Sequence, residues 1–146
     1  MTDLLHAGVK VAVATDGPAS NDDLDLWEEL KLAPLLARGA GHDPQAMDAA
    51  TALNLATRSA GNALGLDDVG VLRSGARADL IRIDLDQPAF TPGEDLLTHL
   101  VFAGSGRYVT DVWVAGKRVV EHRELTTVDL GKAIEEVRVR GRRLAT

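Results

Sequence analysis

The sequence contains no cysteine and very few aromatic side chains. The absence of Cys in 146 residues excludes a disulfide framework, a thiolate nucleophile and a cysteine-based zinc site. Aromatic residues make up 3% of the chain, so a hydrophobic core has to be built from Leu, Val, Ala and Ile. Hydrophobic residues still account for 45% of the chain, and this length and composition are typical of one globular domain with its own core.

A positive net charge and long apolar runs are also absent. The formal net charge is −6 at pH 7, whereas a nucleic-acid-binding surface requires clustered Lys and Arg. No apolar run approaches the roughly 20 residues of a membrane-spanning helix. The first six residues, MTDLLH, lack the basic and apolar regions of a signal peptide. We therefore expect no nucleic-acid partner, no membrane association and a cytoplasmic location.

The most informative stretch is residues 9–27, VKVAVATDGPASNDDLDLW. Its first six residues are mostly small or β-branched, which predicts a strand buried on both faces, as in a parallel sheet. Amide and acidic side chains at residues 21–23 predict the cap of a helix from about Leu24. Asp16 would then lie at the carboxyl end of a buried strand, where α/β sheets and barrels bind ligands. The alternative is that Asp16 is a turn residue that bonds its own backbone.

Helical patterns fill the chain between this stretch and residue 66. Apolar residues recur at helical spacing after Leu24, and Pro34 predicts a kink or a restart. Residues 38–41, RGAG, end this helix. The Asp-Pro pair at 43–44 predicts the start of a second helix that includes the Ala-rich residues 47–64. Its small side chains indicate close packing against another element.

The later part of the chain carries β-strand patterns. Residues 69–75 predict a short strand and a turn, and residues 78–85 alternate in the manner of a half-exposed strand. Residues 109–114 and 117–121 flank an Ala-Gly pair, which predicts a β-hairpin.

Two further helices and a missing sheet complete this organisation. A short helix is predicted over residues 95–103, and a final helix opens at residues 127–129 and runs to about Leu144. The chain thus divides into residues 1–66 and residues 67–146. A single buried strand would leave its backbone groups unpaired, so elements that would cover it are absent from this chain.

Four segments resemble, in order, the metal-dependent amidohydrolase superfamily. Residues 14–25, ATDGPASNDDLD, resemble the loop after the eighth barrel strand. The likeness is closest to the branch of S-adenosylhomocysteine and methylthioadenosine deaminases, which also holds triazine chlorohydrolases and guanine-type deaminases. Residues 56–66 resemble the helix that follows, and residues 112–120, VWVAGKRVV, are similar to the closing hairpin. Residues 70–80, GVLRSGARADL, resemble the G-x-L-x-x-G-K-x-A-D-L signature, with Ala76 where Lys is usual.

The resemblance covers the carboxyl-terminal third of such an enzyme. It implies an α/β fold in which residues 1–66 are the last strand and helices of a (β/α)₈ barrel. Residues 67–146 would form a β-sandwich portion with a closing carboxyl-terminal helix. The missing amino-terminal part of the barrel would be a partner of this chain. Because its absence exposes strand edges and apolar surface, we also expect a homo-oligomer.

The resemblance also implies a site. Asp16 would ligate one divalent metal, zinc or iron, and would act catalytically by taking the proton from the attacking water. Ser20 matches a substrate-facing position, and its alternative is capping or turn formation with Asp23. A His-x-His motif is absent. The four histidines all lie outside the family's ligand motifs: His6, His42, His99 and His122. A catalytic zinc site needs about three protein ligands, so we expect the chain alone to bind no metal and to be inactive.

The implied reaction in a complete enzyme is hydrolytic deamination of a purine-type ring, such as adenosine or S-adenosylhomocysteine. Two alternatives stay open because most pocket residues would lie in the missing part. The first is a related hydrolase of a different heterocyclic substrate, either a triazine chlorohydrolase or an oxidised-guanine deaminase. The second is a non-catalytic chain that keeps this part of the fold as a structural or interaction module.

Overall fold

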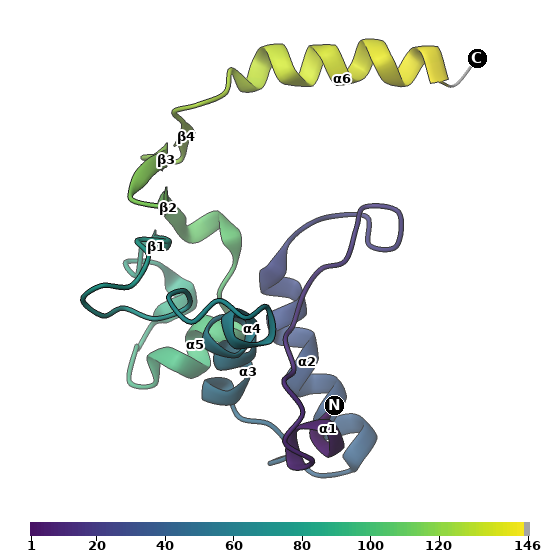
Figure 1. The fold of residues 1–146 in the computed structure, drawn as a ribbon, viewed down its shortest axis with the longest axis vertical. Helices are drawn as coiled ribbons and strands as arrows, with labels where there is room; N and C mark the ends of the chain where they lie inside the picture. Colours follow the sequence, from purple (N-terminus) through teal and green to yellow (C-terminus); the bar gives the residue numbers. More distant parts are fainter. Residues whose placement is uncertain (145–146) are drawn as a thin grey trace.

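The computed structural model describes residues 1–144 and shows a helical body, a sheet and a separate helix (Figure 1). The helices are α1 (Thr2–His6), α2 (Leu26–Gly41), α3 (Ala49–Ala56), α4 (Arg58–Ala63), α5 (Leu96–Phe102) and α6 (Leu130–Leu144). The strands are β1 (Leu80–Ile83), β2 (Val109–Val114), β3 (Lys117–Glu121) and β4 (Glu124–Leu125). Short 3₁₀ turns, η1 (Pro88–Phe90) and η2 (Gly106–Tyr108), lie on either side of α5. The result is a mixed α/β arrangement.

The hydrophobic core lies between α2, α3 and α5. Its buried side chains come from these three helices and from the turn before α3: Leu30, Ala33, Met47, Ala49, Ala52, Leu55 and Val101. Three of the seven are alanines, and the small side chains allow the helices to approach closely. This packing agrees with the expectation from the Ala-rich segment.

Residues 9–14 do not form the predicted strand. This described segment is extended, but it has no strand assignment, and its Val13 N–H donates to the Leu55 carbonyl of α3 at 3.2 Å. Val11 and Val13 pack against the core, whereas Val9 is 48% exposed. A strand exists only through hydrogen bonds to a neighbouring strand. The described residues place no such neighbour beside this segment, so the β-branched pattern alone is insufficient.

The helix after Asp16 begins later than predicted and is not interrupted by its proline. Asp25, rather than residues 21–23, caps α2: its carboxylate accepts a hydrogen bond from the Trp27 N–H at 2.8 Å. The helix continues through Pro34 and ends at Gly41, as the RGAG segment predicted. His42 follows in the left-handed conformation, a common helix ending.

The second predicted helix is shorter and divided in two. It begins at Ala49, where Asp48 accepts the Thr51 N–H at 2.7 Å, rather than at the Asp-Pro pair. Its interruption lies at Thr57, whose φ of −126° and ψ of −94° are not helical. The backbone of Gly70 lies against this break, since a Cβ on Gly70 would be 2.5 Å from the Thr57 carbonyl. Only a residue without a Cβ fits this close against the break between α3 and α4.

The sheet is antiparallel, in the order β1-β2-β3-β4. The predicted hairpin is confirmed with the predicted bounds, as β2 and β3. Its turn residues Ala115 and Gly116 both have positive φ, 50° and 78°, as a two-residue hairpin turn of type I′ requires. The predicted strand over residues 78–85 is shorter, as β1, and residues 69–75 form bends and turns instead of a strand.

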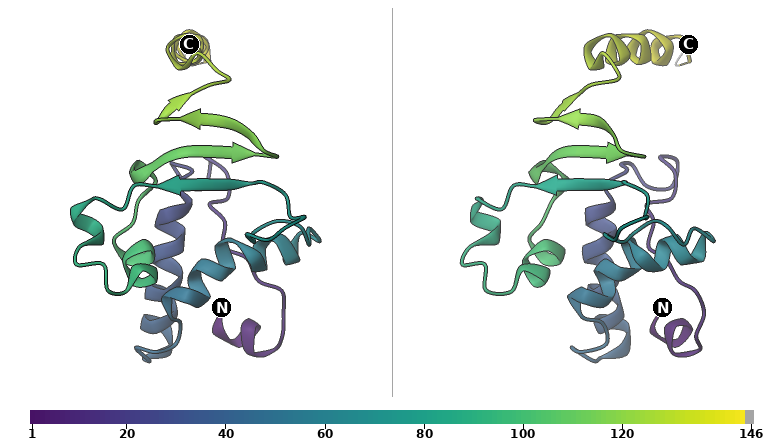
Figure 2. Two further views of the ribbon diagram at one scale, coloured as in Figure 1. Left: turned by 90° about the vertical axis from the view of Figure 1, so that its left-hand side faces the viewer. Right: turned by 60° about the vertical axis from the view of Figure 1, so that its left-hand side comes forward.

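The sheet separates α6 from the helical body. Figure 2 shows the strands stacked with β1 next to the helices and β4 towards α6. The predicted final helix is confirmed from Leu130 to Leu144, and Asp129 caps it by accepting the Lys132 N–H at 2.9 Å. None of its described side chains is buried. No helix within residues 1–144 is both long enough and apolar enough to span a membrane.

Candidate functional site

Asp16 is exposed in a loop between the extended segment and α2. Its φ is 58°, in the left-handed region, where Asp is found more often than most residues. The Ser20 hydroxyl donates to Asp16 Oδ2 at 2.7 Å. This hydrogen bond, and then one from the Gly17 N–H, lower the pKa of Asp16. The carboxylate is therefore ionised at neutral pH, as a metal ligand or a proton acceptor must be.

Ser20 is held by the loop that it closes. Besides its bond to Asp16, its backbone N–H donates to the Gly17 carbonyl at 3.0 Å, which completes a tight turn. The alternative pairing with Asp23 is not formed, because Asp23 accepts from the Asp25 N–H at 2.9 Å. The structure thus brings the two sequence-predicted site residues together. The substrate-facing role of Ser20 stays a prediction.

Asn21 belongs to the same loop as Asp16, and the sequence pattern did not single it out for this place. It was expected to cap a helix, but its side-chain amide donates to the Thr15 carbonyl at 3.2 Å and to Glu29 Oε1 at 2.7 Å. These bonds connect the residue before Asp16 to the first turn of α2. The only signal in the sequence is a lone Asn in an acidic segment, eight residues before Glu29, and that spacing does not predict a contact.

The described residues supply a single candidate metal ligand. No group of three or more His, Cys, Asp or Glu side chains among residues 1–144 is arranged to hold a metal ion. Three histidines have a structural place instead: His99 Nδ1 lies 3.0 Å from the Ala89 carbonyl, and His42 and His122 occupy positive-φ turn positions. Asp16 fits a carboxylate ligand of zinc, but one ligand does not make a catalytic zinc site.

Several hollows lie elsewhere on the described chain, and two of them bear on the search for a site. The first, about 520 Å³, lies between the helices and the sheet and is mainly apolar. It is lined by Leu26, Trp27, Leu30, Leu53, Ala56, Thr57, Asp79, Leu80, Ile81, Val109, Val112, Trp113 and Val114. Asp16 is not among these residues. This hollow is therefore not a binding cavity beside the Asp16 carboxylate.

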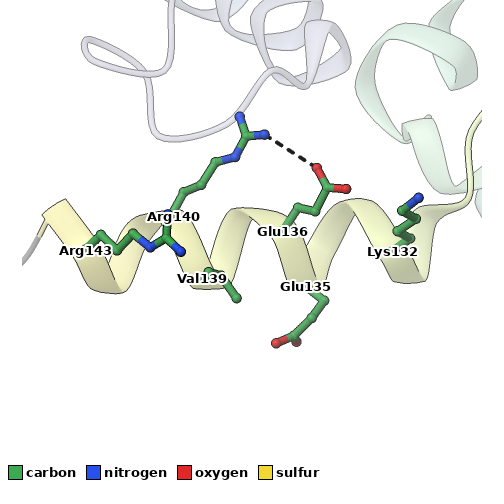
Figure 3. Close-up of a pocket in the computed structure, with 6 residues that line it drawn as sticks. All are labelled: Lys132, Glu135, Glu136, Val139, Arg140 and Arg143. Carbon is green, nitrogen blue, oxygen red and sulfur yellow. Dashed lines mark ion pairs between the residues drawn. The ribbon is translucent and has the colours of Figure 1, made fainter.

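The second hollow, about 380 Å³, has walls from α6 alone. Figure 3 shows Arg140 reaching towards Glu136, an ion pair with a separation of 3.6 Å, while Val139 and Glu135 point to the opposite side. Because it lies on one exposed helix and mixes acidic and basic side chains, this surface neither encloses a ligand nor concentrates charge of one sign. It is not a candidate site.

Comparisons with known proteins match nearly the whole chain. A model of the amidohydrolase family matches residues 1–119. The chain is 42% identical to a 5-methylthioadenosine/S-adenosylhomocysteine deaminase of Dictyoglomus thermophilum, over 137 residues that cover 94% of this chain and 32% of the relative. It is 43% identical to a deaminase of the same description from Bacillus cereus, over 91% of this chain and 31% of the relative.

Solved structures give the same result. A zinc-bound adenosine deaminase from Xanthomonas campestris superposes with a TM-score of 0.94 and 38% identity, over 99% of this chain and 34% of that protein. A zinc-bound atrazine chlorohydrolase from Arthrobacter aurescens superposes with a TM-score of 0.84 and 30% identity, over 94% of this chain and 31% of that protein. The chain spans about a third of the length of the relatives it matches. It belongs to the amidohydrolase family.

Proposed function

We propose that this chain is the carboxyl-terminal segment of a metal-dependent aminohydrolase that deaminates a purine-type ring, such as that of adenosine or S-adenosylhomocysteine. The observation that carries the proposal is the 42% identity to a methylthioadenosine/S-adenosylhomocysteine deaminase over 94% of this chain. The zinc-bound adenosine deaminase at a TM-score of 0.94 supports the same substrate class. In this proposal the segment alone is inactive, because a catalytic zinc site needs about three protein ligands and Asp16 would supply one of them.

In this proposal residues 1–66 belong to the barrel and residues 67–146 to the β-sandwich portion. The extended segment 9–14 becomes the last barrel strand when its neighbours are present. Two observations support this role: the segment is already extended, and it leads directly to the exposed Asp16 carboxylate. Chemistry at the carboxyl ends of barrel strands is the general arrangement of this fold.

The proposed roles of the loop residues follow from their chemistry. A zinc ion, when bound, lowers the pKa of water so that hydrolysis can occur near neutral pH. Asp16 supplies an ionised carboxylate that serves as one metal ligand, takes a proton from the attacking water and returns it towards the leaving amino group. Ser20 keeps the Asp16 carboxylate ionised and oriented, and its exposed position allows it to hydrogen-bond the substrate ring.

The second candidate function is dechlorination of a triazine ring. It is favoured by the similarity to an atrazine chlorohydrolase, although at 30% identity rather than 42%. The reaction class is related, since in both cases water displaces a substituent from a carbon atom of a nitrogen-containing ring. The loop residues would have the same roles, so the carboxyl-terminal third does not by itself separate the two substrates.

The test is to supply the missing two thirds of the fold. Residues 1–146 are fused to the unmatched part of the Xanthomonas deaminase and, separately, of the Arthrobacter chlorohydrolase. Each fusion is assayed with adenosine, S-adenosylhomocysteine and atrazine. We expect deamination by the first fusion that is lost in its Asp16→Ala variant, and little activity from the second.

Three outcomes would contradict the proposal. Activity confined to the chlorohydrolase fusion would contradict the proposal, because the chain would then complete that barrel and not the deaminase barrel. Two inactive fusions that fold and retain zinc would support a non-catalytic chain. Deamination that survives the Asp16→Ala substitution would show that another group is the essential carboxylate.

A further inference from the structure

The loop that carries Asp16 has an uncommon backbone conformation. At φ = 58°, Asp16 lies in the left-handed region, which residues other than Gly occupy as single residues and which Asp tolerates better than most. Such conformations persist where the surrounding structure imposes them, and they cluster at functional sites. The Ser20 hydroxyl binds the Asp16 carboxylate, so it orients the side chain but does not fix the backbone before it.

The backbone before Asp16 is held by Asn21. One N–H of the Asn21 amide donates to the Thr15 carbonyl, and the amide also donates to Glu29 Oε1 at the shorter distance of 2.7 Å. A side-chain amide has two N–H donors, so both are used. The bond to a carboxylate is charge-assisted and therefore the stronger of the two. Asn21 thus joins the peptide before Asp16 to a charged residue on α2.

Glu29 is itself attached to the core. It lies in the first turn of α2, directly before Leu30, which is 4% exposed. The same turn is tied to α5, because the Trp27 indole N–H donates to the Leu100 carbonyl at 2.7 Å. Gly104 makes this bond possible, since a Cβ there would lie 2.5 Å from the Trp27 indole nitrogen. The support for the Asp16 loop therefore continues into the packed helices.

We propose that Asn21 and Glu29 are positioning residues that hold Asp16 in the conformation its function requires. The inference rests on the proposed function for Asp16, and it adds two residues that act through the Thr15 peptide. Ser20 and Asn21 have separate tasks, because Ser20 binds the carboxylate and Asn21 binds the backbone. Loss of Asn21 should misplace Asp16 while its hydrogen bond to Ser20 remains.

The first test measures the backbone of Asp16 without reference to activity. The one-bond Cα–Hα coupling of Asp16, which is smaller at positive φ, is measured by NMR in the full 146-residue chain. We expect Asn21→Ala and Glu29→Ala to shift it towards the value of an ordinary extended residue. Glu29→Gln keeps an oxygen acceptor and should retain the original coupling. Asp22→Ala, an exposed residue of the same loop, is the matched control.

The second test uses the same variants in the fusion with the Xanthomonas deaminase. We expect Asn21→Ala and Glu29→Ala to weaken zinc retention and to lower kcat roughly 10- to 100-fold, because small misplacements of catalytic groups have effects of this size. KM should change by less than about twofold, since substrate binding is not removed. Glu29→Gln should recover most of the activity, and the double variant should lose no more than the single ones.

These measurements distinguish the inference from the proposed function. An inactive parent fusion with an Asp16 coupling that responds to Asn21→Ala would contradict the function and support the positioning role. An active fusion whose coupling, zinc retention and kcat are all unchanged in Asn21→Ala would overturn the positioning role. Equal losses in Glu29→Gln and Glu29→Ala would also overturn it, because the hydrogen-bond acceptor would then be irrelevant.

Discussion

Asp16 and Asp111 are two carboxylates with lowered pKa values and very different surroundings. Asp16 is exposed, and hydrogen bonds from Ser20 and Gly17 favour its ionised form. The side chain of Asp111 is fully buried in β2 and forms ion pairs with Arg82 of β1 and Arg118 of β3. The first is available to a ligand, whereas the second joins three strands of the sheet. A low pKa by itself therefore does not identify a functional carboxylate.

At Asp16 we predict a large and selective loss of activity. In the active fusion, Asp16→Ala should reduce kcat by a factor on the order of 10³ or more, because a metal ligand and a proton acceptor are removed together. Asp22→Ala should change kcat and the free energy of unfolding little, since Asp25 and not Asp22 caps α2. The measurement is steady-state kinetics of the three proteins. Similar losses in both variants would contradict the assignment of Asp16 as the essential carboxylate.

At Asp111 we predict a pH-dependent contribution to stability. Burial raises the pKa of Asp111, but hydrogen bonds from Thr110 and the His122 N–H, together with Arg118, outweigh it and lower the pKa from 3.8 to about 2. A carboxylate whose pKa is lower in the folded state stabilises that state above its unfolded pKa. This stabilisation should be complete above about pH 5 and should be lost progressively as the pH falls through the folded-state pKa of about 2.

The check is denaturant unfolding of the chain and its Asp111→Asn variant between pH 7 and pH 2. We expect the variant to be less stable at pH 7, because Arg82 and Arg118 lose their buried partner. The difference between the two proteins should narrow below pH 4. Other carboxylates with lowered pKa values contribute to the pH dependence of the free energy of unfolding in both proteins: Asp16, Asp48, Asp84 and Asp95. A constant difference across the range would show that Asp111 is not ionised in the folded chain.

At the scale of elements, the β2–β3 hairpin depends on a two-residue turn with an unusual occupant. Ala115 has φ = 50°, which is unfavourable for a residue with a Cβ and no polar side chain. Its N–H is held by Asp79 Oδ1 at 2.6 Å, which explains how Ala is tolerated there. Asp79, which belongs to the signature segment 70–80, thus binds the hairpin turn.

We predict that Ala115→Asn stabilises the chain, because Asn-Gly is the preferred pair for this type of turn. The expected gain is roughly 0.5–1 kcal/mol in the free energy of unfolding, measured by thermal or denaturant unfolding. Gly116→Ala should destabilise the chain, because it places a Cβ at φ = 78°. The loss in the free energy of unfolding should exceed the gain from Ala115→Asn. If both substitutions left stability unchanged, the hairpin turn would differ from the conformation described.

At the scale of the whole molecule, the described residues expose extended backbone and apolar side chains. The extended segment 9–14 has one hydrogen bond to α3 and no described strand partner, and no described side chain of α6 is buried. Exposed apolar side chains occur on several elements, among them Leu24, Leu36, Leu72 and Val137. Extended backbone and apolar surface of this kind favour association.

We therefore predict that the isolated chain self-associates at micromolar concentration, as measured by sedimentation velocity. Hydrogen exchange on residues 9–14 tests whether this segment forms the contact between copies of the chain. In an associated form the amides of this segment should be protected. They should exchange rapidly when dilution yields monomer, except at Val9 and Val13, whose N–H groups donate to the carbonyls of Leu4 and Leu55. A monomer with all of these amides protected would contradict the prediction and would require an internal strand partner.

Much of the second half of the chain was predictable from sequence alone. The hairpin, the short helix α5 and the closing helix α6 were predicted because each depends on a local pattern: alternation around a turn pair, or a capping Asp before apolar residues. The family was also evident from four segments in order. At the site, the Asp16–Ser20 pair could be predicted from sequence, because the two residues are four positions apart in a tight loop that brings their side chains together.

The rest was decided by contacts between residues distant in sequence. Segment 9–14 has strand composition, but no neighbour within residues 1–144 makes it a strand. The break at Thr57 lies against Gly70, and Asn21 joins the Thr15 carbonyl to Glu29. Local preferences are free energies of a fraction of a kcal/mol per residue, and they are readable from sequence. Backbone pairing and side-chain bridges require a partner in space, and only the tertiary structure supplies it.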